Sequence, residues 1–240
     1  MRLVREIRLK KRATTMAEKM RWAVLSLGYF SRNRYWGEDE GTTYRSPLCT
    51  STFVEINGAR LVIDPPVYGR QMEEMLDQRT GLTVDKIDYV FITHYHSDHY
   101  VGLGCFPKAR LLAAPGDLER LREVLYGAHE KKHLRDMFPN AGELAARVEP
   151  AGKQIMPGVE LVELPGHTPG LAGAMFEGPE GRIVAAGDAV MTADFFRDRL
   201  GYYNSVDFGL SKKSIEKIAE IADIVVPGHS NYFVCAAAGR

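Results

Sequence analysis

Three histidines and one aspartate fall within six consecutive positions of the stretch ITHYHSDHYVG, residues 92–102. His94 and His96 are two residues apart, so in an extended chain their side chains point to the same side and can bind one metal ion. Asp98 and His99 are adjacent and lie further along the turn, where they can reach a second ion. This density of metal-binding side chains requires a fold that presents them all at one place.

Further candidate ligands each follow a predicted strand. IDYVFITH is typical of a buried strand that delivers His94 at its end. VELVEL (159–164), RIVAAG and DIVVPG are followed by His167, Asp188 and His229. Loops at strand ends are where scaffolds commonly carry their chemistry. If these ends share one edge of the sheets, the side chains converge there.

The number of candidate ligands predicts two metal ions, because seven ligands exceed the four of one tetrahedral ion. Imidazole and carboxylate ligands without thiolate suit zinc, and also suit iron or manganese. A water that bridges two such ions loses its proton near neutral pH and attacks a carbonyl or phosphoryl centre. Asp98 is the expected catalytic residue that moves the proton. We assign His94, His96 and His167 to the first ion, Asp98, His99 and His229 to the second, and Asp188 to both.

The remaining patterns predict one layered α/β domain over residues 20–240. WAVLSLG (22–28) is the first strand, and Asn57-Gly58 between TFVEI and ARLVID is a strong hairpin signal. Residues 1–20 hold seven Lys/Arg against two Glu, so we expect 1–19 to be a basic, disordered N-terminal extension. Helices are expected over 69–79, after Asp117, over 129–138 and 143–148, and after Ser211.

The charge balance gives no reason to expect nucleic acid or a membrane surface as partner, because 31 basic residues offset 31 acidic ones. No stretch approaches 18 apolar residues, and the basic N-terminus lacks the apolar run of a signal peptide. Cysteines 49, 105 and 235 are odd in number and far apart, as expected of reduced thiols in a cytoplasmic protein. We expect the partner to be a small-molecule substrate. Whether the chain forms a homodimer stays open.

In order and in strand context, HYHSDH, PGHTPG, AAGDAV and VPGHS resemble the metallo-β-lactamase superfamily, whose signature is HxHxDH followed by separate His, Asp and His ligands. The resemblance covers about residues 20–230. It implies a four-layer αββα sandwich with a dinuclear metal site at one edge. It also implies that Asp64, at the end of RLVID, supports the histidine loop from behind. Pro65-Pro66 follows where the family commonly has a glycine.

Features that this chain lacks exclude several branches of this superfamily and the reactions that go with them. True β-lactamases typically have cysteine or serine where this chain has Asp188. The glyoxalase II branch adds a C-terminal helical domain, which we do not expect in the 11 residues after His229. The RNA-processing branch has a large inserted domain, whereas His229 lies only 41 positions after Asp188. We therefore expect a compact hydrolase, similar to lactonases and esterases, that cleaves an ester, lactone or thioester bond.

Several alternatives stay open. A phosphodiesterase or a mononuclear iron sulfur dioxygenase of the same fold would use overlapping ligands, and a non-catalytic sensor would bind without turnover. Di-iron flavoproteins usually carry a glutamate at one histidine position, against which His96 argues. HEKKH at 129–133 matches the HExxH zincin pattern but lacks the expected downstream ligand, so we interpret it as a chance match. Whether His129 or His133 borders the substrate pocket stays open.

Two loops are candidates for choosing the substrate. The first is 30–48, which contains Phe30, Tyr35 and Trp36. The second is YYNSVDF at 202–208, where Tyr202, Tyr203 and Asn204 are placed to donate hydrogen bonds to a carbonyl oxygen. The alternative is that these aromatic side chains only pack against the domain.

Overall fold

The computed structural model describes residues 20–39, 41–128, 138 and 140–235. The basic segment 1–19 and the HEKKH motif, with His129 and His133, lie outside the described residues, so the predictions made for them stay predictions. In the part of the chain that is described, no helix combines the length and apolar character needed to cross a membrane.

The first sheet has six strands in the order β1-β2-β3-β4-β5-β6. Strands β1 to β3 are antiparallel, and β3 to β6 run parallel. Asn57 (φ 52°) and Gly58 (φ 86°) form the predicted hairpin turn, because both take the positive φ that a tight two-residue turn needs. The strands are β1 Met20–Ser26, β2 Ser51–Ile56, β3 Ala59–Ile63, β4 Tyr89–Ile92, β5 Arg110–Ala113 and β6 Val148–Pro150.

The second sheet also has six strands, in the order β12-β11-β10-β9-β8-β7. Strands β10 and β11 are parallel, and the other neighbours are antiparallel. Strands β6 and β7 have three residues each, too few for alternation to predict them. The strands are β7 Gln154–Met156, β8 Val159–Glu163, β9 Ala172–Gly178, β10 Gly181–Gly187, β11 Ile224–Pro227 and β12 Phe233–Val234.

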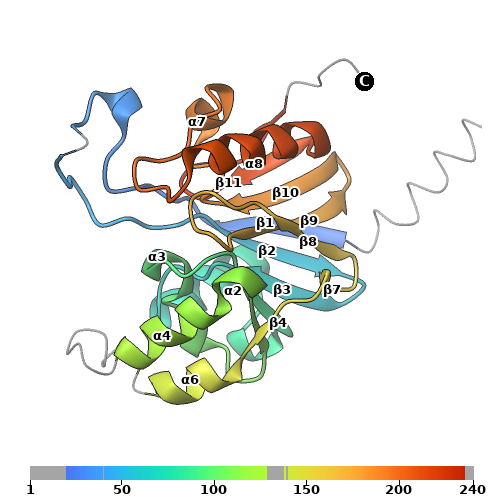
Figure 1. Cartoon of the computed structure of the whole chain (residues 1–240). Helices are drawn as coiled ribbons and strands as arrows, with labels where there is room; N and C mark the ends of the chain where they lie inside the picture. Colours follow the sequence, from blue (N-terminus) through green and yellow to red (C-terminus); the bar gives the residue numbers. More distant parts are fainter. Residues whose placement is uncertain (1–19, 40, 129–137, 139, 236–240) are drawn as a thin grey trace, which may run out of the picture.

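Helices cover the outer faces of both sheets (Figure 1). Met72 of α2 and Leu121 of α4 are buried in one cluster with side chains of the first sheet. Ile215 and Ile218 of α8 are buried against strands β10 and β11 of the second sheet. The predicted four-layer α/β sandwich is therefore confirmed. The helices are α2 Arg70–Thr80, α3 Ser97–Tyr100, α4 Leu118–Ala128, α6 Ala141–Arg147, α7 Ala193–Arg197 and α8 Phe208–Ile221.

The inner faces of the two sheets share a separate apolar core. Val54, Leu61 and Phe91 of the first sheet belong to one buried cluster with Phe176 and Ile183 of the second. Burying each such side chain contributes about 1.5–3 kcal/mol. This central layer fixes the position of one sheet on the other, and with it the strand ends that carry the candidate ligands.

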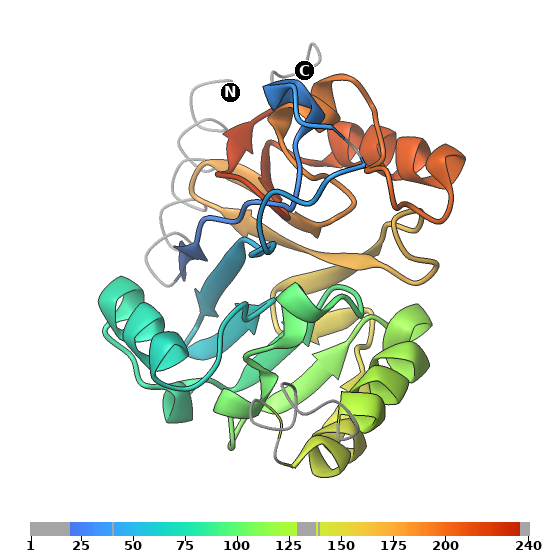
Figure 2. The same cartoon turned by 90° about the vertical axis from the view of Figure 1, so that its left-hand side faces the viewer.

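The candidate ligands follow strand ends at one edge of the sandwich, the edge that faces the reader in Figure 2. Strand β4 leads into α3, β8 leads towards His167, β10 into Asp188 and β11 into His229. The segment between β1 and β2, residues 27–50, crosses the same edge and carries the 3-10 helix η1, Arg34–Trp36. The edge therefore holds both the histidine motif and the loop predicted to choose the substrate.

Candidate metal centre

Three imidazole nitrogens and one carboxylate oxygen form the first group of candidate ligands. Nδ1 of His96 lies 3.0 Å from Nε2 of His94 and 3.0 Å from Nε2 of His167. Oδ2 of Asp188 lies 3.2 Å from Nε2 of His167 and 3.7 Å from Nε2 of His94. These four ligand atoms all lie within 4.8 Å of one another.

The second group joins Asp98, His99 and His229, whose ligand atoms also lie within 4.8 Å of one another. Oδ2 of Asp98 lies 3.5 Å from Nε2 of His229 and 3.8 Å from Nε2 of His99. Both imidazoles are buried, and the side chain of Asp98 is 14% exposed. Asp98 is therefore the carboxylate of this group that solvent reaches.

Asp188 connects the two groups through its two oxygens. Oδ1 lies 3.1 Å from Nε2 of His99 and 3.2 Å from Nε2 of His229. Oδ2 faces the nitrogens of the first group. One buried carboxylate thus presents one oxygen to each group, which is the arrangement that a bridging ligand needs.

Two glycines make room for this carboxylate. Gly187, which precedes it, has φ 51°, and a Cβ there would lie 2.6 Å from Oγ1 of Thr93. A Cβ on Gly228 would overlap Oδ1 of Asp188 itself. Glycine at 187 therefore lets the end of β10 lie against Thr93, and glycine at 228 lets the end of β11 lie against Asp188.

Burial favours the neutral form of two rings of the first group, His94 and His96. It lowers the pKa of His94 well below its ordinary value, with repulsion from His99 as the next cause. Burial likewise lowers the pKa of His96 to about 4, with repulsion from His167 as the next cause. Neutral imidazole is the form that binds a metal. These two rings therefore need no deprotonation near pH 7 before they bind an ion.

In the second group the pKa values of the histidines are raised instead of lowered. Burial works to lower the pKa of His229, but the neighbouring Asp188 outweighs it and raises that pKa. For His99 burial also favours the neutral ring, but Cys49 and the carboxylates of Asp188, Asp64 and Asp98 around it raise the pKa well above its ordinary value. This end of the site therefore has a negative field that attracts a cation.

Asp64 holds the histidine loop from behind, where the resemblance implied. Its Oδ2 accepts hydrogen bonds from Nδ1 of His99 at 2.8 Å and from Oγ1 of Thr93 at 2.7 Å. Its Oδ1 accepts from the backbone N–H of Thr93 at 2.8 Å. Oγ1 of Thr93 also lies 3.1 Å from Nδ1 of His94. Because Nδ1 of both rings has a partner, Nε2 of both rings faces the centre.

The proline pair after Asp64 packs directly against the same loop. The N–H of Gly102 donates to the carbonyl of Pro65 at 2.9 Å, and a Cβ on Gly102 would lie 2.8 Å from Cβ of Pro65. Asp64 itself takes a positive φ of 51°. The chain therefore turns at Asp64, and Pro65 packs against the end of the histidine loop at Gly102.

His229 is oriented by the segment between β1 and β2. Its Nδ1 donates to the carbonyl of Leu48 at 2.9 Å, which leaves Nε2 for the centre. The ring of Phe30 packs edge-on against it, with centroids 5.7 Å apart. This segment therefore fixes one candidate ligand as well as bordering the site.

Asp117 is a buried carboxylate that the sequence pattern does not connect with the site. The sequence predicts it as a helix cap, but its side chain crosses to the loop after His167. Its oxygens accept hydrogen bonds from Oγ1 of Thr168 and, at 2.8 Å, from the N–H of Gly170. The N–H of Tyr95 also donates to it. Asp117 therefore joins the loop that carries His96 to the loop that carries His167.

The donor set fits two divalent cations. Nε2 of His99 and Oδ1 of Asp188 are buried and have no hydrogen-bond partner among the described residues. Nε2 of His94 and Nε2 of His167 both lie 3.0 Å from Nδ1 of His96. A single proton cannot form hydrogen bonds among all three nitrogens. Imidazole and carboxylate without thiolate suit zinc, iron or manganese.

Tyr35 and Trp36, two of the predicted substrate contacts, lie on η1 in the segment between β1 and β2. The hydroxyl of Tyr35 donates to Oδ2 of Asp198 at 2.5 Å, and its ring packs edge-on against Phe195. Trp36 is 64% exposed and lies beneath the guanidinium of Arg45 at 5.3 Å. Tyr35 thus connects η1 to α7, and its hydroxyl already has a protein acceptor.

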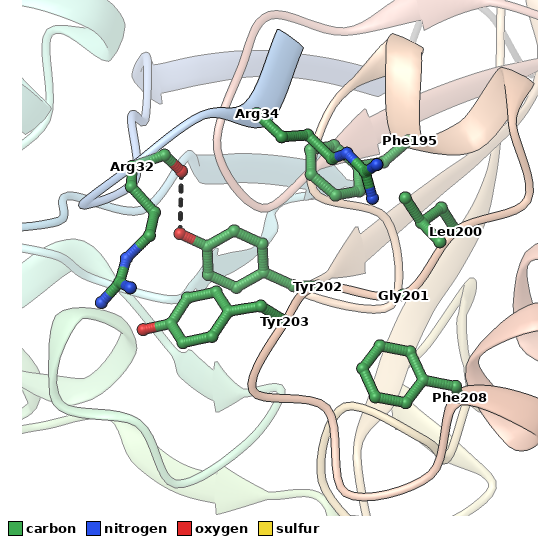
Figure 3. A pocket seen from close by; sticks show the side chains of 8 residues that line it. All are labelled: Arg32, Arg34, Phe195, Leu200, Gly201, Tyr202, Tyr203 and Phe208. Atoms are coloured by element: carbon green, nitrogen blue, oxygen red, sulfur yellow. Dashed lines mark hydrogen bonds between the residues drawn. The ribbon is translucent and has the colours of Figure 1, made fainter. Parts of the chain in front are cut away.

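The other predicted contacts lie on the loop before α8. Tyr202 is buried, and its hydroxyl donates to the carbonyl of Arg32 at 2.9 Å (Figure 3). Tyr203 is exposed and stacks on the guanidinium of Arg32 at 4.1 Å, and Asn204 is also exposed. The predicted role of all five residues in substrate binding stays a prediction. Among the three on this loop, Tyr203 and Asn204 are the solvent-facing ones.

Comparison with known proteins gives one family. Residues 47–229 match the family model for the metallo-beta-lactamase superfamily. An N-acyl homoserine lactonase of a Bacillus species is 26% identical over 158 residues, which cover 63% of this chain and 59% of that protein. The chain thus spans less than two thirds of that relative. The N-acyl homoserine lactonase of Bacillus cereus is 25% identical over 199 residues, 80% of this chain and 74% of that protein.

Solved structures show the same fold at lower identity. A mutant of the AiiA lactonase of Bacillus thuringiensis with N-decanoyl-L-homoserine bound has a TM-score of 0.61 and 18% identity, and the match covers 88% of this chain and 92% of that one. AidC, a dizinc quorum-quenching lactonase, has a TM-score of 0.57 and 15% identity, with 75% and 72% covered.

Proposed function

The chain belongs to the metallo-β-lactamase superfamily, and from that premise we propose that it is a dinuclear metal-dependent hydrolase of ester, lactone or thioester bonds in small molecules. Its membership already makes it a metal-binding hydrolase by fold. The number of ions, their identity and the bond that is cleaved belong to the proposal.

The observation that carries the proposal is the position of Asp188 between two groups of donors. One oxygen lies 3.2 Å from Nε2 of His167, and the other lies 3.1 Å from Nε2 of His99. We propose that His94, His96 and His167 hold one ion, that Asp98, His99 and His229 hold the other, and that Asp188 bridges them. Zinc is favoured by the imidazole-rich donor set and by the dizinc lactonase of the same fold.

When bound, the two ions supply Lewis acidity and a deprotonated water near neutral pH. The protein supplies position and proton transfer. Asp64 and Leu48 fix the rings of His99 and His229 through their Nδ1 atoms. The carboxylate of Asp98, whose side chain is partly exposed, accepts the proton of the attacking water and returns it to the leaving oxygen.

The relatives favour a lactone as substrate. Both Bacillus proteins are N-acyl homoserine lactonases, and a lactone is a cyclic ester whose carbonyl the proposed centre would attack. The identity is about a quarter, so the acyl and ring parts that this chain accepts are inferred from its own residues and not from these relatives.

The experiment is a substrate panel on one purified sample, with lactones, thioesters, β-lactams and phosphodiesters. We expect turnover of lactones or other esters, and loss of turnover in Asp98→Ala. Turnover confined to phosphodiesters favours the phosphodiesterase alternative. One iron per chain together with oxygen uptake favours the sulfur dioxygenase alternative, and either result contradicts the proposal.

A further inference from the structure

A pocket lies beside the metal centre, between η1 and the loop before α8 (Figure 3). Its volume is about 170 Å³, similar to the cavity of about 150 Å³ that holds a benzene ring in other proteins. Four of the lining residues are aromatic and two are arginines, and Leu200 and Gly201 complete the wall. The residues used below are Arg32, Arg34, Phe195, Tyr202, Tyr203 and Phe208.

The pocket borders the centre through one aromatic ring. Phe30 packs edge-on against Tyr202, with centroids 5.1 Å apart, and against His229 at 5.7 Å. The loop that carries Tyr202 continues to Val206, whose N–H donates to the carbonyl of His167 at 3.2 Å. The pocket and the candidate ligands thus lie on the same edge of the sandwich, with one layer of side chains between them.

Two arginines give this pocket its charge. Among the described residues, neither Arg32 nor Arg34 has an acidic partner within 4.0 Å. Nε of Arg32 is buried and lacks a hydrogen-bond partner in the described structure. The guanidinium of Arg32 is held against the ring of Tyr203 at 4.1 Å. A buried donor without an acceptor is costly unless a ligand supplies one.

The acidic side chains nearby are engaged with other groups, and in the described structure none of them lies within 4.0 Å of the guanidinium of Arg32. Asp198 accepts from Tyr35 and pairs with Arg197 at 3.3 Å. Asp194 pairs with Arg197 at 2.9 Å. Asp207 accepts from the N–H of Leu210 at the start of α8. The Asp198 carboxylate also attracts Arg34 electrostatically, so it offsets part of the positive charge of the pocket. Arg32 carries the charge that stays without an acidic partner in the described structure.

We propose that this pocket is a subsite for a carboxylate-bearing part of the substrate, about the size of one ring and remote from the bond that is cleaved. Carboxylate oxygens match the planar donors of a guanidinium, and Arg32 offers its Nε–H to them. Phe195, Tyr202 and Phe208 contact the apolar body to which the carboxylate is attached. This inference rests on the proposed function and adds the substrate class: esters or lactones with a distal carboxylate.

The direct test is binding, measured by calorimetry on the metal-loaded protein with phenylacetate and with its uncharged analogue phenylacetamide. We expect phenylacetate to bind about tenfold more tightly or better, and Arg32→Gln and Arg34→Gln each to reduce that preference. Arg70→Gln is the matched control, because Arg70 lies on α2 with its side chain 87% exposed. Equal binding of the two probes overturns the subsite. A preference that survives in both pocket variants places the carboxylate elsewhere and also overturns it.

A second measurement separates the subsite from the proposed reaction. The 4-nitrophenyl monoester of glutaric acid carries a distal carboxylate, and 4-nitrophenyl valerate does not. We expect higher kcat/KM for the charged ester, with Arg32→Gln raising its KM more than that of the neutral ester. If neither ester is cleaved but phenylacetate binding depends on Arg32, the subsite stands and the hydrolase proposal fails. If both esters are cleaved alike and phenylacetate shows no preference, the hydrolase proposal stands and the subsite fails.

Discussion

Oδ2 of Asp64 accepts a hydrogen bond at 2.8 Å from Nδ1 of His99, on the side of the ring that faces away from the centre. Nε2 of the same ring lies 3.1 Å from Oδ1 of Asp188. A single imidazole thus connects the end of β3 to the carboxylate that links the two groups of donors. The geometry of the centre therefore depends on a residue that lies behind it.

Asp64→Asn is expected to weaken metal binding while the chain still folds. The asparagine side chain keeps one oxygen, which can still accept from the N–H of Thr93. The amide nitrogen that replaces Oδ2 cannot accept from Oγ1 of Thr93 and Nδ1 of His99. Loss of such an outer partner typically costs about 10- to 100-fold in metal affinity. Competition with a chromophoric chelator measures the affinity, and Asp77→Asn on α2 is the control. Wild-type affinity in Asp64→Asn would contradict the role given to this carboxylate.

Gly228→Ala is expected to disrupt the centre from the end of β11. The added Cβ overlaps Oδ1 of Asp188, so the carboxylate or the strand end must move. We expect a lower metal content after dialysis and a lower melting temperature. Gly127→Ala on α4 is the matched control, because a Cβ there has no atom within 4 Å and alanine favours a helix by about 0.5–1 kcal/mol. Equal metal content in Gly228→Ala and the control would count against a fixed Asp188.

Asp117→Asn is expected to loosen the loop that carries His167. The carboxylate accepts hydrogen bonds from Thr168 and Gly170. An asparagine amide has only one acceptor oxygen, so one of these buried donors loses its acceptor, at a cost of about 1–3 kcal/mol. Denaturant unfolding measures that cost. Metal titration of the same variant shows whether the first group is affected more than the second. An unchanged first ion would limit Asp117 to a role in stability.

The hydrogen bond between Tyr35 and Asp198 predicts a loss of stability in alkali. Burial, followed by the Asp198 carboxylate, raises the pKa of Tyr35 from 10.0 to about 12. Because the folded-state pKa is above the unfolded one, this stabilisation is fully present below pH 10 and is lost as the pH rises towards 12. Tyr35→Phe should therefore lower the unfolding free energy more at about pH 8 than at about pH 11.5.

Chemical denaturation of both proteins at the two pH values checks this prediction. The pKa of Tyr100 is also raised to about 12, by burial first, but Tyr100 is present in both proteins, so its effect cancels in the difference. A difference between wild type and Tyr35→Phe that is the same at both pH values would show that the tyrosine hydroxyl has no coupling to Asp198.

The candidate ligands could be predicted from the sequence because each one follows a strand with a strong apolar pattern. His94 and His229 each stand two positions after the last residue of a buried strand, and the spacing within HYHSDH is local. The hairpin at Asn57-Gly58 is local as well. Features of this kind depend on a few neighbouring residues, which is why pattern alone identifies them.

Contacts between distant loops could not be predicted in the same way. Asp117 reaches Thr168, 51 positions along the chain, and no local pattern distinguishes this buried carboxylate from a helix cap. Tyr35 similarly donates to Asp198 across 163 positions, so its hydroxyl has a protein partner that the sequence does not reveal. The three-residue strands β6 and β7 depend on pairing with their neighbours rather than on their own residues.

The number of metal ions per chain tests the central claim most directly. Purified protein equilibrated with excess zinc, freed of unbound metal and analysed by mass spectrometry should contain two ions per chain, and Asp188→Ala should contain fewer because both groups lose an oxygen ligand. One ion per chain in the wild type, or two ions retained in Asp188→Ala with unchanged affinity, would contradict a dinuclear centre bridged by Asp188.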